Sequence, residues 1–202
     1  MKLFLLTLGF CCGSSFIAQS QKINYVKISV TNSQTARPFT KFSALFHSPI
    51  HPGFEVGYMK TQRVGKHGQW LLEPALSYTF HRWVQHNISL VVQEYYRHCL
   101  GAGFSISGRL GAGYQVSIPT SKIFELSGET IKAKKFPARS QLTFNVGIGA
   151  EKQVNKQGMS IGLMYQQKIQ TPFVKNYVPL LPYNCMMISL AIPVQQKKLK
   201  SL

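Results

Sequence analysis

The stretch LGAGFSISGRLGAGYQVSI, residues 100–118, alternates between two sets of residues for longer than any other segment of the chain. One set is apolar and is interrupted only by Gly108, while the other set is small or polar. A strict period of two is typical of a β-strand whose faces meet different environments. At about 3.3 Å per residue this strand would run roughly 60 Å, which suits a tilted barrel strand that crosses a membrane and extends beyond it.

Shorter alternating segments recur along the rest of the chain. They cover residues 25–30, 54–60, 70–81, 86–96, 141–151, 159–168 and 184–194, and residues 38–47 compete with 25–30 for the place of the first strand. Pro74 cannot donate a hydrogen bond to a β-ladder, so we expect a bulge or break there. Glu94 falls on the apolar face, either because the alternation slips by one residue or because Glu94 lies at the membrane interface. With one N-terminal strand counted, the chain has eight predicted strands, an even number as in single-chain outer-membrane barrels. We therefore expect an all-β fold, a closed antiparallel up-and-down transmembrane barrel.

The connections between these strands differ in length in a regular way. If the N-terminus is periplasmic, the long segments 119–140 and 170–183 lie outside the cell, and the short turns 61–68, 97–100 and 154–157 lie in the periplasm. This asymmetry is typical of outer-membrane barrels and is independent of the alternation that predicts the strands. It favours localisation in the cell outer membrane.

Residues 1–20 have the composition of a secretory signal peptide. Lys2 precedes an apolar run, and Ala18 and Ser20 have a spacing compatible with cleavage after Ser20. Lipidation at Cys11 or Cys12 is the alternative. Residues 21–202 then form a single β-barrel domain with a short basic C-terminal tail, and no later run of about 18 apolar residues predicts a spanning helix.

The formal net charge of the chain is +17, and every acidic residue is a glutamate. Such a charge favours polyanions such as acidic glycans or the phosphates of lipopolysaccharide, whereas no motif indicates nucleic-acid binding. We expect outer-membrane lipid and lipopolysaccharide as partners, although charged loops are often simply solvated. The candidate polyanion-binding residues are Lys122, Lys132, Lys134, Lys135 and Arg139 in one predicted extracellular loop and Lys175 in the other.

Three strings, HPGFEVGY at 51–58, LGAGY with the following SIP at 110–119 and QTPFVKNYVPLLPYN at 170–184, carry a family resemblance. Together with the signal peptide, they resemble small outer-membrane β-barrel proteins of the Bacteroidetes type, most of them uncharacterised. The resemblance implies the barrel architecture and brings no catalytic residues. The tail QQKKLKSL at 195–202 departs from it, since many barrels end on an aromatic insertion signal.

The inward set of side chains contains charges that should meet inside the barrel: Glu55, Glu73, Arg109, Glu151 and Lys168. An eight-stranded barrel is only wide enough for side chains to fill it, so these groups should pair. We expect Arg109 to contact at least one of the three glutamates. The network would plug the lumen, with a proton or ion path as the alternative.

No arrangement of residues predicts catalysis or a metal site, so we expect no enzyme activity, catalytic residue, metal or cofactor. His86 and Ser89 invite comparison with barrel-wall lipid A hydrolases, but a spacing of three places them on opposite faces of a strand and no acidic residue is near. His47 and His51 lack a third ligand at suitable spacing.

Two further expectations concern the fold. Cys99, in a periplasmic turn, and Cys185, after an extracellular loop, should be separated by an apolar band of about 25 Å and should not form a disulfide. The rival fold is a soluble secreted barrel of lipocalin type that binds a small apolar ligand, with its apolar face inward. The Gly, Ser and Asn of the other face favour a crowded lumen instead.

Overall fold

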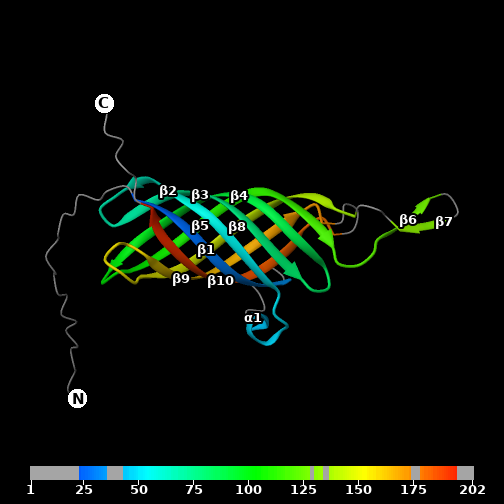
Figure 1. Ribbon diagram of the computed structural model, residues 1–202, viewed down its shortest axis with the longest axis horizontal. Helices are drawn as coiled ribbons and strands as arrows, with labels where there is room; N and C mark the ends of the chain where they lie inside the picture. The colour runs from blue at the N-terminus through cyan, green and yellow to red at the C-terminus, as the bar shows by residue number, and fades with distance from the viewer. Residues whose placement is uncertain (1–22, 36–42, 128–129, 134–136, 174–177, 195–202) are drawn as a thin grey trace, which may run out of the picture.

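The computed structural model describes residues 23–35, 43–127, 130–133, 137–173 and 178–194, and eight of its strands close into one barrel (Figure 1). The predicted signal peptide, with the cysteines considered for lipidation, and the C-terminal tail lie outside the described residues. The barrel strands are β1 (Asn24–Thr35), β2 (Pro52–Val64), β3 (Gly68–His81), β4 (Gln85–Gly101), β5 (Phe104–Pro119), β8 (Arg139–Gln153), β9 (Ser160–Thr171) and β10 (Leu181–Val194).

Every barrel strand pairs antiparallel with its neighbour, in the order β1-β10-β9-β8-β5-β4-β3-β2. The first and last strands complete the ring, from Asn24 opposite Val194 to Thr35 opposite Tyr183. The expected closed eight-stranded up-and-down barrel is thus confirmed. No helix in the described part of the chain is long and apolar enough to span a membrane.

The alternation read from the sequence separates the two faces of the wall. On β5, Ile106, Leu110 and Tyr114 are exposed on the outside, whereas Ser107 and Arg109 are buried inside. The other barrel strands also carry exposed apolar side chains on the outer face. An apolar exterior around a polar interior is the reverse of a soluble barrel, so the facing rules out the lipocalin-type alternative.

The turn between β4 and β5 differs from the sequence-based expectation. Residues 97–99 do not form a turn but continue β4, and the chain reverses at Gly101, Ala102 and Gly103, whose φ angles are 104°, 49° and 75°. Glycine adopts positive φ at little cost, so Gly101 and Gly103 allow a tight reversal around Ala102. Leu100 and Ala102 happen to continue the apolar alternation of Phe104 through the turn. The sequence therefore predicts a strand from residue 100, whereas β5 begins at Phe104.

The N-terminal ambiguity is resolved in favour of residues 24–35, which form β1. The competing segment contains the short helix α1 (Ala44–His47), and residues 36–42 lie outside the described part.

The two expected irregularities are also resolved. At Pro74 the β2–β3 ladder is interrupted between the pairs Gly57–Ala75 and Lys60–Leu72, while the β3–β4 ladder runs through Pro74 opposite Val92. The register shift itself lies between Thr61 and Arg63. Glu94 is exposed on the outer wall and β4 keeps its phase, so no slip occurs.

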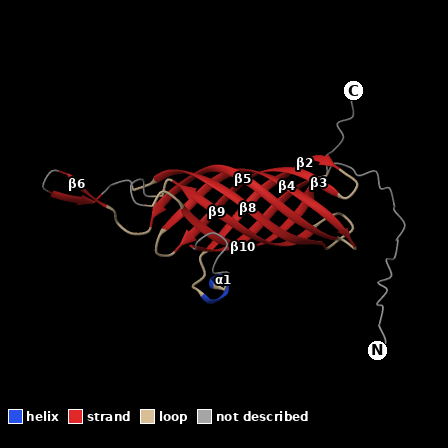
Figure 2. Ribbon diagram, turned by 180° about the vertical axis from the view of Figure 1, so that it is seen from behind, coloured by secondary structure: helices blue, strands red, loops and turns tan. Residues whose placement is uncertain are grey.

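The two ends of the barrel differ in their connections. The short links β2–β3, β4–β5 and β8–β9 lie at the end where β1 begins and β10 ends (Figure 1). The opposite end carries the long links β1–β2, β5–β8 and β9–β10, together with the short link β3–β4 at residues 82–84. Residues 119–140, expected to be irregular, contain a hairpin of β6 (Phe124–Ser127) and β7 (Thr130–Ala133) that projects beyond the barrel (Figure 2). This is the arrangement of periplasmic turns and extracellular loops in outer-membrane barrels.

Candidate functional site

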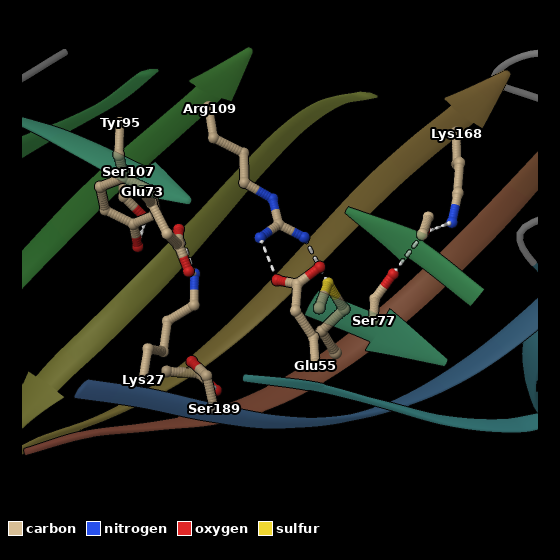
Figure 3. A network of polar contacts seen from close by, with 12 residues as sticks. Lys27, Glu55, Glu73, Ser77, Tyr95, Ser107, Arg109, Lys168 and Ser189 are labelled. Atoms are coloured by element: carbon tan, nitrogen blue, oxygen red, sulfur yellow. Dashed lines mark hydrogen bonds and ion pairs between the residues drawn. The ribbon is translucent and has the colours of Figure 1, made fainter. Parts of the chain in front are cut away.

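Three buried ion pairs join the strands across the lumen of the barrel. Arg109 Nη1 lies 2.9 Å from Glu55 Oε1, and Lys27 Nζ lies 2.6 Å from Glu73 Oε1 (Figure 3). Arg97 Nη2 lies 2.7 Å from Glu151 Oε2. Half of the six acidic residues of the chain are thus neutralised inside the barrel. The predicted contact of Arg109 with at least one of the three glutamates is made with Glu55.

Lys168, the fifth charged residue expected in the lumen, is also buried there. Its Nζ donates to Ser89 Oγ at 3.0 Å, and Ser89 in turn shares a 2.6 Å hydrogen bond with Ser77 (Figure 3). A cavity of about 20 Å³ adjoins Lys168 and Glu55. That volume is close to the space one water molecule needs, so side chains fill most of this level of the lumen.

Two members of the network, Lys27 and Arg97, are not among the lumen charges predicted from the sequence. Lys27 could have been found, because it shares the inward phase of Tyr25 and Ser29 on β1. Arg97 was assigned to a turn, although it continues the inward phase of Gln93 and Tyr95. Both cations also approach the Tyr95 ring, at 5.0 Å for Lys27 and 5.9 Å for Arg97, and cation–π contact stabilises charges that have left water.

The periplasmic end of the lumen is more open than its middle. A vestibule of about 250 Å³ is lined by Tyr25, Gln69 and other residues near the turns, with the Arg97–Glu151 pair among its walls. Tyr95 Oη donates to Glu151 Oε1 and lies within hydrogen-bond distance, 3.0 Å, of Ser107 Oγ. These hydrogen bonds join β4, β5 and β8 in one polar layer beside the vestibule.

At the extracellular end, uncharged polar side chains replace the ion pairs. Gln170 Oε1 accepts hydrogen bonds from Gln85 Nε2 at 2.9 Å and from Gln115 Nε2 at 2.8 Å. Beside them, the rings of His51 and His81 stack with centroids 3.7 Å apart, and Trp83 lies edge-on to His51. Burial and the nearby Arg82 lower the pKa of His51, which lies at the rim before β2. The neutral form of the His51 ring is therefore favoured in the stack.

The residues considered for catalysis or metal binding are separated in the structure. His86 faces outward, its Nδ1 2.9 Å from Tyr78 Oη, whereas Ser89 lies inside the lumen. His47 is exposed in α1, and His51 is buried against His81. Among the residues that the structure describes, no group of three or more His, Cys, Asp or Glu could hold a metal ion.

The basic residues proposed to bind polyanions are described only in part. Lys122 and Lys132 are exposed. Arg139 is half-buried and ties two extracellular segments together, since its Nη1 donates to Phe173 O at 3.2 Å and its guanidinium lies over the Phe173 ring. Lys134, Lys135 and Lys175 lie outside the described residues.

The two cysteines among the described residues are free thiols. Cys99 is exposed near the β4–β5 turn, and Cys185 is buried near the opposite end of β10.

A closed barrel with an apolar outer wall, a charge-paired lumen, short turns at one end and long loops at the other defines an outer-membrane β-barrel protein. The chain is located in the outer membrane.

Solved structures share this fold. Neisserial surface protein A matches with a TM-score of 0.56 at 8% identity, over 84% of this chain and 96% of that chain. Ail, the attachment invasion locus protein of Yersinia pestis, matches with a TM-score of 0.51 at 13% identity, over 87% of this chain and 100% of that chain. The outer membrane enzyme PagL gives a TM-score of 0.49 at 13% identity, over 84% and 99%. No protein-family model and no curated protein sequence matches the chain.

Proposed function

We propose that this protein is a non-enzymatic outer-membrane barrel with a structural and surface-interaction role, whose basic extracellular loops bind the phosphates of lipopolysaccharide or the acidic groups of glycans. We also assign it to the Bacteroidetes type of small barrels on the sequence strings described above. In this proposal the lumen is a plug and the extracellular surface is the binding site.

The observation that carries the proposal is the segregation of charge. Glu55, Glu73 and Glu151 are buried with cationic partners, so they do not offset the basic groups outside. Residues 119–139 contain five basic and two acidic residues, a net charge of +3. Lys122 and Lys132 are exposed on the segment that projects farthest from the barrel (Figure 2). Several cations on one projecting loop can each form a charge-assisted hydrogen bond to a polyanion.

The geometry disfavours the two alternative functions. A barrel-wall lipid A hydrolase based on His86 and Ser89 would need both side chains on one face, and they lie on opposite faces. A proton or ion path would have to pass the Tyr95–Glu151 layer, which joins β4, β5 and β8, and the glutamine cluster, which joins β4 and β5 to β9.

The proposal is tested by replacing the two lysines that the structure describes as exposed on the projecting segment, Lys122→Ser and Lys132→Ser, in the full chain held in nanodiscs. Binding of heparin and of lipid-free lipopolysaccharide polysaccharide is measured from about 0.05 M to about 0.2 M salt. We expect weaker binding and a shallower salt dependence in the variant. The matched control is Lys66→Ser with Lys156→Ser, which removes the same charge from two exposed periplasmic turn positions. Equal losses in both variants, or in neither, would contradict the proposal.

A further inference from the structure

The outward face of β1 changes character along the strand. Val26, Ile28 and Val30 face outward and are followed in the same phase by Asn32 and Gln34. Asn32 Nδ2 donates to Leu45 O at 2.8 Å, and Gln34 Nε2 donates to Pro49 O at 2.6 Å. Amide side chains on the outer wall thus fasten the segment of residues 43–51, which covers them.

This fastening gives the segment an unusual place. Helix α1 lies beside the barrel wall, next to β1 and β10, whereas the β6–β7 hairpin extends away from the end of the barrel (Figures 1 and 2). Leu45 is buried against the wall, but Phe46 is 69% exposed and Ile50 is 70% exposed. A segment held on the outer wall of a membrane barrel with large apolar side chains exposed is suited to contact lipid.

Between α1 and the wall lies a groove of about 250 Å³, lined by Val30, Thr31, Asn32, Leu45, Phe46, Met186 and Ile188. A cavity of about 150 Å³ with an apolar lining already holds a benzene molecule, so the groove has room for several methylene groups. Val30 and Ile188 are 59% and 56% exposed, and both belong to the apolar outer wall. The groove is therefore continuous with the surface that contacts the bilayer.

We propose that the groove holds an acyl chain of a lipopolysaccharide molecule from the outer leaflet. Asn32 and Met186 lie nearer the extracellular than the periplasmic ends of β1 and β10, which places the groove in the extracellular half of the wall. Lipopolysaccharide supplies the acyl chains at that depth of an outer membrane. The assignment rests on the apolar lining and not on the basic loops, so it stands apart from polyanion binding.

The test uses the full chain in phosphatidylcholine nanodiscs that contain a minor fraction of rough lipopolysaccharide, with retained lipid measured by native mass spectrometry after mild detergent release. Val30→Trp fills the groove and Phe46→Ala removes one of its walls. Each should reduce retained lipopolysaccharide roughly tenfold, the equivalent of about two methylene groups losing their contacts. Val92→Trp is the matched control, since Val92 is 51% exposed on the outer wall of β4, away from α1. Heat-modifiable migration in gels confirms that each variant is folded.

The outcomes separate this assignment from the others. The assignment is wrong if Val30→Trp and Val92→Trp retain equal amounts of lipopolysaccharide, or if the protein retains phospholipid in preference to lipopolysaccharide. It is also wrong if Val30→Trp loses a bound second copy of the chain and not a bound lipid. Lipid-free polysaccharide should not compete with the retained lipid. The variant with Lys122→Ser and Lys132→Ser should keep the retained lipid at high salt even if it loses polyanion binding.

Discussion

The Arg109–Glu55 pair is buried so completely that its two charges depend on each other. Removing one member leaves the other desolvated without a counter-charge, which typically costs about 3–5 kcal/mol, whereas replacing both with apolar groups costs much less. We expect Arg109→Gln to lower the free energy of unfolding by about that amount, and Arg109→Met with Glu55→Leu to lower it far less. Urea titrations of the refolded protein in lipid vesicles measure both.

Glu94→Gln provides the control for this prediction, because Glu94 is exposed on the outer wall of the barrel. We expect its effect on stability to stay within about 0.5 kcal/mol. A single Arg109 variant as stable as the double variant would show that Glu55 is hydrated inside the lumen.

His51 makes the extracellular rim sensitive to acid. Its pKa lies below the ordinary value of 6.5, because burial and Arg82 disfavour the charged ring. Above about pH 6.5 the ring is neutral whether the chain is folded or unfolded. As the pH falls below 6.5, the unfolded chain takes up the proton first, and stability declines until the folded ring also titrates.

We therefore expect the free energy of unfolding from urea titrations to fall between about pH 7 and about pH 5, and to fall less in His51→Phe. His47→Gln is the control, since His47 is exposed in α1. An unchanged pH dependence in His51→Phe would mean that the His51–His81 stack tolerates a charge.

At the scale of the strands, periodicity predicted which face of each strand is inside, but it could not locate every end. A period of two determines facing wherever one face is apolar, so the inward places of Glu55, Glu73, Arg109, Glu151 and Lys168 followed from the sequence. Turns are set by backbone conformation, and the positive φ angles at residues 101–103 leave the apolar alternation unbroken. Because the alternation does not mark the end of β4, the sequence predicts a turn at Arg97 and not an inward position on the strand.

Two glycines on β5 give a matched test of how closely the strands pack. A methyl group added at Gly113 would meet the backbone of β4 at Leu90 and Val91, whereas one added at Gly108 would come no nearer than 3.9 Å, to Gly147 O. Backbone in a barrel ladder cannot move aside, so Gly113→Ala should lower the free energy of unfolding by about 1–3 kcal/mol. Gly108→Ala should be neutral or slightly stabilising, as loss of glycine restricts the unfolded chain. The two variants are compared by urea titration, and equal effects would contradict the close packing of β4 against β5 at Gly113.

At the scale of the whole molecule, loop lengths predicted the two ends of the barrel, but they did not predict what the long connections do. The alternation in the β6–β7 hairpin is too short to predict strands. The position of α1 at the wall depends on amide side chains of β1, and their role as hydrogen-bond donors to this segment can be seen only once β1 is paired with β10. The segments that carry both proposals were therefore the least predictable from the sequence. Their contacts are made between strands that are distant in the chain.

The native cysteines report the orientation of the barrel in the membrane. Cys99 is exposed at the end that carries the short turns, and Cys185 is buried in the wall. We expect a membrane-impermeant maleimide to reach these two thiols only after the outer membrane is made permeable, and to label Cys99 but not Cys185. In a Cys99→Ser background, Lys132→Cys on the projecting hairpin should be labelled in intact cells, because Lys132 is exposed at the opposite end. Labelling of Cys99 in intact cells would reverse the orientation and place the basic hairpin in the periplasm, where no lipopolysaccharide leaflet could meet the groove beside α1.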